Sequence, residues 1–142
     1  MSFFKDKFIS CRWGGRVIVS GILSCLLLLG CSRPDPGEVA ARAAKQFYDY
    51  LLEGKYDAFV DGQYREGEIP QGYREQLITN AQMFVGQQKN KHRGIKEVRV
   101  VNAKVDTALH SANVFLVFTY GDSTNEEICV PMLEHEGIWY LR

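Results

Sequence analysis

The chain has 142 residues, and its 17 basic side chains balance 17 acidic ones, so that the formal net charge is zero. The 112 residues after position 30 can bury a sufficient core without disulfides or metals. The lack of a basic excess argues against nucleic acid as a partner.

The N-terminus has the three parts of a secretory signal. Residues 1–16 carry a net charge of +3, and residues 17–32 form an uncharged, largely apolar run of 16 residues. A membrane-spanning helix needs roughly 20 apolar residues, so this run is short for a permanent anchor. The run contains Leu-Leu-Gly-Cys at residues 28–31, which resembles a bacterial lipobox. We therefore predict that residues 1–30 are a cleaved lipoprotein signal peptide and that Cys31 carries the lipid, palmitate included.

Lipidation would attach the protein to a membrane of the cell envelope. Ser32 and Arg33 stand where an inner-membrane retention signal has Asp, which favours the outer membrane and leaves its periplasmic or surface face open. An ordinary secretory signal and an uncleaved anchor are the alternatives. Loss of residues 1–30 leaves 13 basic and 16 acidic residues, a net charge of −3. It also leaves Cys129 as the one cysteine besides Cys31, and its strand pattern predicts a buried free thiol.

Residues 31–37 form a short lipidated tether, and residues 38–142 form one domain. Asp35 and Pro36 predict the start of a helix that ends at Gly54. A short helix over residues 55–60 and a polar loop over residues 61–70 follow. Apolar residues at helical spacing predict a long helix over residues 71–90. Its expected buried face consists of Tyr73, Leu77, Ile78, Ala81, Phe84 and Val85.

After Gly94 the apolar period changes from 3.6 residues to 2. Four strands are expected, over residues 95–105, 110–120, 125–133 and 137–141. The short turns between them predict an antiparallel meander. Both faces of the second strand are partly apolar, which indicates helices on one face and something else, such as a partner subunit, on the other. The fold class is thus α+β, with N-terminal helices packed on a four-stranded antiparallel sheet.

The chain is similar to proteins with the nuclear-transport-factor-like, or cystatin-like, α+β fold, which ketosteroid isomerase and the SnoaL-like cyclases share. More narrowly, it resembles small Gram-negative lipoproteins built around a domain of unknown function. The similarity covers about residues 36–142. It is carried by five short motifs: Ala44-x-x-Phe47-Tyr48, Glu53-Gly54-Lys55-Tyr56, Gly94-Ile95, Ala112-Asn113-Val114 and Gly137-Ile138-Trp139.

This resemblance implies a curved sheet that wraps around the long helix and forms a cone with an open mouth. Inward aromatic side chains would then line a cavity. The candidates are Tyr48, Phe59, Tyr64, Phe84, Phe118, Tyr120 and Trp139. The same spacing is equally expected of aromatic residues that simply fill a core, and the pattern does not distinguish the two interpretations.

An isomerase-like site would need a carboxylate base and an opposing tyrosine. The acids near apolar segments are Asp57, Asp61 and Asp106, with Tyr48 or Tyr120 as donors. None of them stands in a recognisable enzyme motif. Asp106 is also expected in a turn, where Asp is common for backbone reasons.

The sequence contains no clear motif for a metal, phosphate or lipid-headgroup site. His92, His110 and His135 fall at a helix end, a strand start and a turn, without metal-ligand spacing. There is no phosphate-binding loop or nucleophile elbow. The basic residues within 89–96 suit a solvated helix end. We expect no cofactor, no metal and no catalytic residue.

The sequence favours a non-enzymatic envelope lipoprotein whose domain binds a small apolar ligand or a partner protein. Two alternatives remain: an isomerase-like or cyclase-like enzyme, and an interaction module that forms a homodimer through its sheet face.

Overall fold

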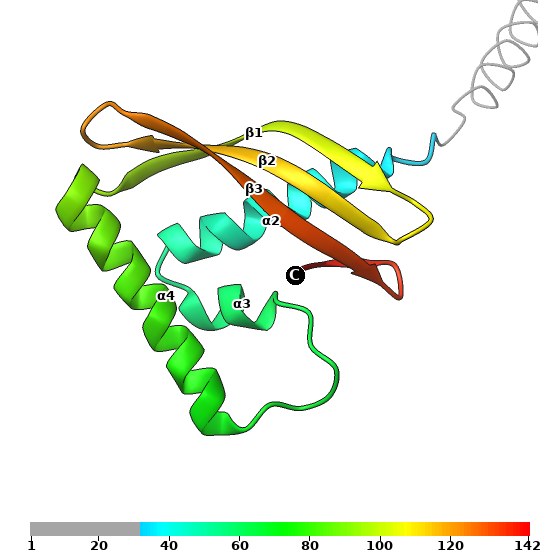
Figure 1. Ribbon diagram of the computed structural model, residues 1–142, viewed down its shortest axis with the longest axis horizontal. Coiled ribbons are helices and arrows are strands. Elements are labelled where there is room, and N and C mark those ends of the chain that lie inside the picture. Colours follow the sequence, from blue (N-terminus) through cyan, green and yellow to red (C-terminus); the bar gives the residue numbers. More distant parts are fainter. Residues whose placement is uncertain (1–31) are drawn as a thin grey trace, which may run out of the picture. The chain divides into compact units, whose positions relative to one another are not determined.

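The computed structural model describes residues 32–142, and the signal segment and lipobox Cys31 lie outside this range. Residues 34–142 form one compact unit. Its elements follow one another as α2 (Pro36–Leu52), α3 (Tyr56–Asp61), α4 (Gln71–His92), β1 (Ile95–Asp106), β2 (Ser111–Tyr120), β3 (Asn125–His135) and β4 (Ile138–Leu141). The predicted α+β architecture, with helices packed on a four-stranded antiparallel sheet, is confirmed (Figure 1).

The sheet is a meander in which the strand order β1-β2-β3-β4 is also the chain order. β2 and β3 pair without interruption, whereas β1 shifts its register against β2 at two positions. The segment after α3 extends the β4 edge: Leu141 N–H donates to Gly62 at 2.8 Å, and Tyr64 N–H donates to Leu141 at 2.7 Å. This segment therefore ties the helices to the last strand.

β2 is buried on one face only, and this face holds the core. Val114, Leu116, Phe118 and Tyr120 are buried, whereas the residues between them are half-buried. The inner face of α2 that covers them is built from alanines, namely Ala40, Ala41 and Ala44. Because these side chains are small, the helix can lie close to the strand.

Both ends of α2 are defined by backbone conformation and not by side-chain capping. Asp35 makes no capping hydrogen bond with its side chain, contrary to the predicted role, and Pro36 supplies the first helical residue. Gly54 follows the helix with φ of 76°. Lys55 N–H then donates to the Tyr50 carbonyl at 2.9 Å, which gives one of the carbonyls in the last turn of α2 a hydrogen-bond partner.

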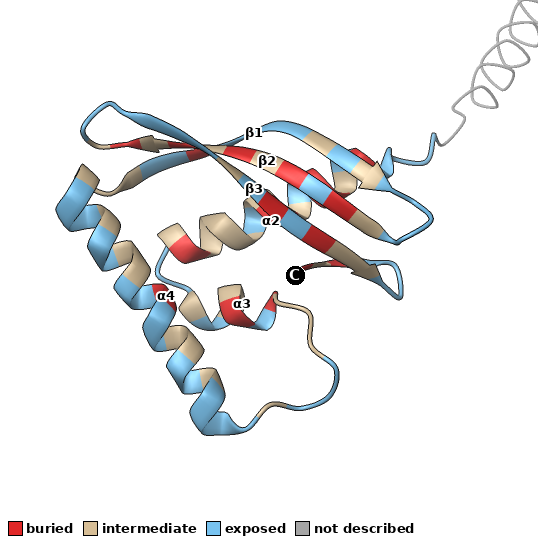
Figure 2. Cartoon of the chain, viewed as in Figure 1, coloured by how far each residue is buried: buried red, intermediate tan, exposed pale blue. Residues whose placement is uncertain are grey.

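α4 is less buried than predicted. Ala81 is its one buried residue, and Tyr73, expected on the buried face, is 50% exposed. Figure 2 shows α4 as largely exposed along its length. The resemblance implied a sheet that wraps around this long helix, whereas α2 makes most of the contacts between helices and sheet. α4 instead packs mainly on α3. Its less exposed side chains still follow the predicted face, because Leu77, Ile78, Phe84 and Val85 are half-buried on the same stripe as Ala81.

Cys129 is exposed, so the prediction of a buried thiol is wrong. Its partner in the β2–β3 register is Phe115, on the sheet face opposite the core, although Cys129 also borders the cavity described below. The strand pattern could not reveal which face the helices cover. Among residues 32–142, no helix has both the length and the hydropathy of a membrane-spanning segment.

The core position of β2 can be tested with a matched pair of leucines. Leu116 is 0% exposed and Leu109, in the β1–β2 turn, is 69% exposed. In residues 32–142 we expect Leu116→Ala to lower the free energy of unfolding by about 2–5 kcal/mol. Leu109→Ala should change it by less than about 0.5 kcal/mol. Urea denaturation followed by circular dichroism measures both, and equal effects would contradict the assigned core.

Candidate functional site

The C-terminal end of α4 is fastened to the β2–β3 turn by backbone hydrogen bonds. Gly121 N–H donates to Gly94 at 2.8 Å, and Asp122 N–H donates to His92 at 3.1 Å. A Cβ atom at position 121 would lie 2.5 Å from the Arg93 carbonyl oxygen. Glycine is therefore required at position 121 by the close approach of the two segments.

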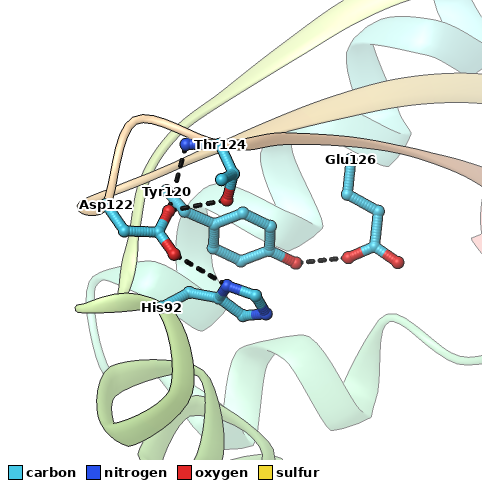
Figure 3. A network of polar contacts seen from close by, with 5 residues as sticks. All are labelled: His92, Tyr120, Asp122, Thr124 and Glu126. Atoms are coloured by element: carbon cyan, nitrogen blue, oxygen red, sulfur yellow. Dashed lines mark hydrogen bonds and ion pairs between the residues drawn. The ribbon is translucent and has the colours of Figure 1, made fainter.

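Side chains reinforce this attachment (Figure 3). His92 Nδ1 lies 2.9 Å from Asp122 Oδ2, and the Thr124 hydroxyl donates to Asp122 Oδ1 at 2.6 Å. Hydrogen bonds from Thr124 and then His92 lower the pKa of Asp122 to about 2. The carboxylate is thus ionised at any physiological pH and organises the turn.

Tyr120 links this turn to the interior. Its ring stacks on the His92 ring, with centroids 4.5 Å apart, and its hydroxyl donates to Glu126 Oε2 at 2.5 Å. Burial, followed by the hydrogen bond to Glu126, raises the pKa of Tyr120 to about 12. The side chain therefore remains a neutral phenol that donates to the carboxylate.

The other end of α4 is fastened by an ion pair. The Arg74 guanidinium donates to both carboxylate oxygens of Asp61, at 2.9 and 2.8 Å. The hydrogen bond from Arg74 lowers the pKa of Asp61. Asp61 is exposed and already paired, so it does not face the interior.

A cavity of about 500 Å³ lies between the helices and the inner sheet face. The typical range for small-molecule sites is roughly 300–1,000 Å³. The cavity in this protein is lined by residues from α2, α3, α4, β2, β3 and the segment after α3. They are Tyr48, Leu51, Phe59, Gln63, Leu77, Asn80, Ala81, Phe84, Gln88, Phe118, Tyr120, Glu126, Ile128 and Cys129. The wall is mainly apolar and aromatic, with three carboxamides and one carboxylate.

The aromatic side chains form a connected wall. The Tyr48 ring lies 5.6 Å from Phe59 and 5.5 Å from Phe118, and Phe118 lies 6.2 Å from Tyr120. The rings meet at steep angles, as in edge-to-face packing, so they present both faces and edges to the cavity. Burial raises the pKa of Tyr48, which remains neutral.

The structure brings five of the seven aromatic candidates together at this cavity: Tyr48, Phe59, Phe84, Phe118 and Tyr120. Trp139 is buried in the core near the start of α2. Tyr64 contacts His135 and Tyr140 at the β4 edge, beside an open depression of about 660 Å³. This depression is larger, but its wall is polar and holds the Asp61–Arg74 pair.

The carboxylates considered for catalysis lie outside the cavity. Asp57 is exposed on α3, and Asp106 accepts hydrogen bonds from the backbone of its turn. The sequence reasoning missed Glu126, the one carboxylate in the cavity wall. A signal existed, because Glu126 has the same strand parity as the inward-facing Ile128 and Val130.

Within residues 32–142, no group of three or more His, Cys, Asp or Glu side chains is placed to hold a metal ion. His92, His110 and His135 lie apart, and each has its own acidic neighbour.

Comparison with solved structures shows the class of fold. A candidate NTF2-like transpeptidase from Campylobacter jejuni matches with a TM-score of 0.56 at 13% identity, over 69% of this chain and 92% of that chain. A SEC-C motif containing protein from Rhodopseudomonas palustris matches with a TM-score of 0.49 at 12% identity, over 72% of this chain and 76% of that chain.

The first match shows that the domain has the NTF2-like fold. No protein-family model matches the sequence. No curated protein matches it either. At such low identity the fold is established, and the activity of the neighbour is not transferred.

The Tyr120–Glu126 hydrogen bond predicts that Tyr120 ionises to phenolate at a higher pH than an ordinary tyrosine does. The folded pKa of about 12 lies above the ordinary value of 10.0. Neutral Tyr120 therefore stabilises the fold fully below pH 10, and this contribution is lost as the pH rises through about 12. In a titration of phenolate absorbance, Tyr120→Phe should remove a phase near pH 12.

Glu126→Gln should shift this phase to lower pH, because it removes a neighbouring negative charge. Glu127→Gln, on the opposite sheet face, is the matched control and should not shift it. Circular dichroism at each pH checks that the chain is still folded. A Tyr120 transition near pH 10 in the wild type would contradict the assigned hydrogen bond.

Proposed function

We propose that this protein is a lipid-anchored envelope protein whose NTF2-like domain binds a small apolar or amphipathic ligand without transforming it. The observation that carries the binding role is the cavity under α4, with its aromatic wall and few polar groups. The lipid anchor is proposed from the pattern Leu-Leu-Gly-Cys at residues 28–31, and Ser32 and Arg33 favour the outer membrane.

The polar groups of the cavity suit binding better than acid–base catalysis. Tyr120 and Glu126 are hydrogen-bonded to each other, and the pKa of Tyr120 is raised to about 12. A general acid works best with a pKa near the ambient pH. Asp57, Asp61 and Asp106, on which an isomerase-like site would depend, do not line the cavity.

The anchor is tested by Cys31→Ala in the full-length protein. We expect the substitution to abolish lipidation and signal processing, with loss of the acyl mass and of incorporated palmitate label. Ser32→Ala is a neighbouring control that should leave both intact. If Cys31→Ala neither changes the processed mass nor reduces membrane retention, the lipoprotein proposal is wrong.

The cavity is tested with the uncharged fluorophore N-phenyl-1-naphthylamine and residues 32–142. Wild type should bind it with a blue-shifted emission. Ala81 is almost fully buried in the cavity wall, so Ala81→Phe should fill space and weaken binding by at least about tenfold.

Ala108→Phe, in the exposed β1–β2 turn, is the matched control and should bind like wild type. Urea denaturation of both variants separates a filled cavity from an unfolded chain. Equal affinity in the folded Ala81→Phe variant would place the fluorophore elsewhere, and no binding to wild type would overturn the binding proposal.

A further inference from the structure

We infer that the ligand of this cavity is an amphipathic organic cation, with an aromatic or aliphatic body and one ammonium group directed at Glu126. This inference rests on the proposed binding function and specifies the chemical class of the ligand. It combines the charge of the cavity wall, the arrangement of its aromatic rings and the environment of Glu126.

The cavity wall carries charge of one sign only. Among the fourteen lining residues, Glu126 is the single ionic side chain, and there is no Lys, Arg or His. His92 and Asp122 contact each other, and the His92 ring stacks on the Tyr120 ring, so neither residue lines the cavity. An anionic ligand would meet an uncompensated carboxylate, whereas a cation would neutralise it.

Glu126 has a carboxylate oxygen that can bind a cationic ligand group. Tyr120 donates to Oε2, and in residues 32–142 no other side chain donates to this carboxylate. No basic residue of this described region lies within ion-pairing distance of it. Oε1 is therefore available to accept a hydrogen bond from an ammonium group while Tyr120 holds the carboxylate in place.

The aromatic wall favours the same charge. The linked rings of Phe59, Tyr48, Phe118 and Tyr120 lead toward the hydroxyl that contacts Glu126. Aromatic faces carry negative electrostatic potential and attract ammonium groups, and such contacts strengthen when water is excluded. Asn80 and Gln88 of α4 add neutral carboxamides whose oxygens can also accept hydrogen bonds.

The experiment compares three ligands that share one naphthalene body. Naphthylmethylamine is cationic, naphthylmethanol is neutral and naphthoate is anionic at neutral pH. Each displaces N-phenyl-1-naphthylamine from residues 32–142, or is measured directly by calorimetry. We expect the amine to bind roughly tenfold more tightly than the alcohol, and naphthoate to bind most weakly.

Glu126→Gln should reduce the amine-to-alcohol affinity ratio to near one, because it removes the negative charge that favours the amine. The two side chains have almost the same shape, so the substitution changes little else. Glu127 is exposed, as Glu126 is, but it lies on the opposite sheet face and does not line the cavity, so Glu127→Gln should leave the ratio unchanged. Higher ionic strength should reduce the ratio in wild type, since an ammonium–carboxylate contact is screened.

The outcomes separate the two proposals. If the alcohol and the fluorophore bind but the amine has no advantage, the cation inference fails and the binding function stands. A wild-type preference for naphthoate, or an amine preference that persists in Glu126→Gln, also overturns the inference. If none of the compounds binds, the binding function fails and the inference falls with it.

Discussion

The attachment of α4 at both ends is the constraint on which the rest of the site depends. At its C-terminus, backbone and side-chain hydrogen bonds join His92 and Gly94 to the β2–β3 turn. At its N-terminus, Arg74 makes a bidentate contact with Asp61 of α3. Between these ends only Ala81 is buried. Because both ends of α4 are attached, the middle of the helix keeps its position without packing closely on the sheet. The space between α4 and the sheet is the cavity.

The inner surface of α2 explains where the cavity begins. Its first three turns present alanines to the sheet, and close packing leaves no room there. Farther along, Tyr48 and Leu51 replace the alanines and become part of the cavity wall. One helix thus supplies the dense core at one end and the aromatic wall at the other.

The turn that holds α4 also orients the polar pair of the cavity. The ring of His92 stacks on Tyr120, and the hydroxyl of Tyr120 positions Glu126. The His92–Asp122 pair and the Glu126 carboxylate at the cavity wall are therefore connected through a single aromatic ring. The NTF2-like fold by itself hosts many functions, so any function of this domain depends on the particular side chains that line its cavity.

Local patterns in the sequence were sufficient for the elements and the class of fold. Pro36 and Gly54 marked α2, and the change of period after Gly94 marked the meander, because helix ends and strand alternation are short-range properties. Tertiary structure alone decided which sheet face is covered, and hence that Cys129 is exposed although it lies in an apolar strand. It also decided that Tyr73 is half exposed and that Tyr64 and Trp139 lie away from the cavity. These outcomes depend on which distant segments pack against one another, as His92 does against Asp122 30 residues away, and periodicity carries no information about such contacts.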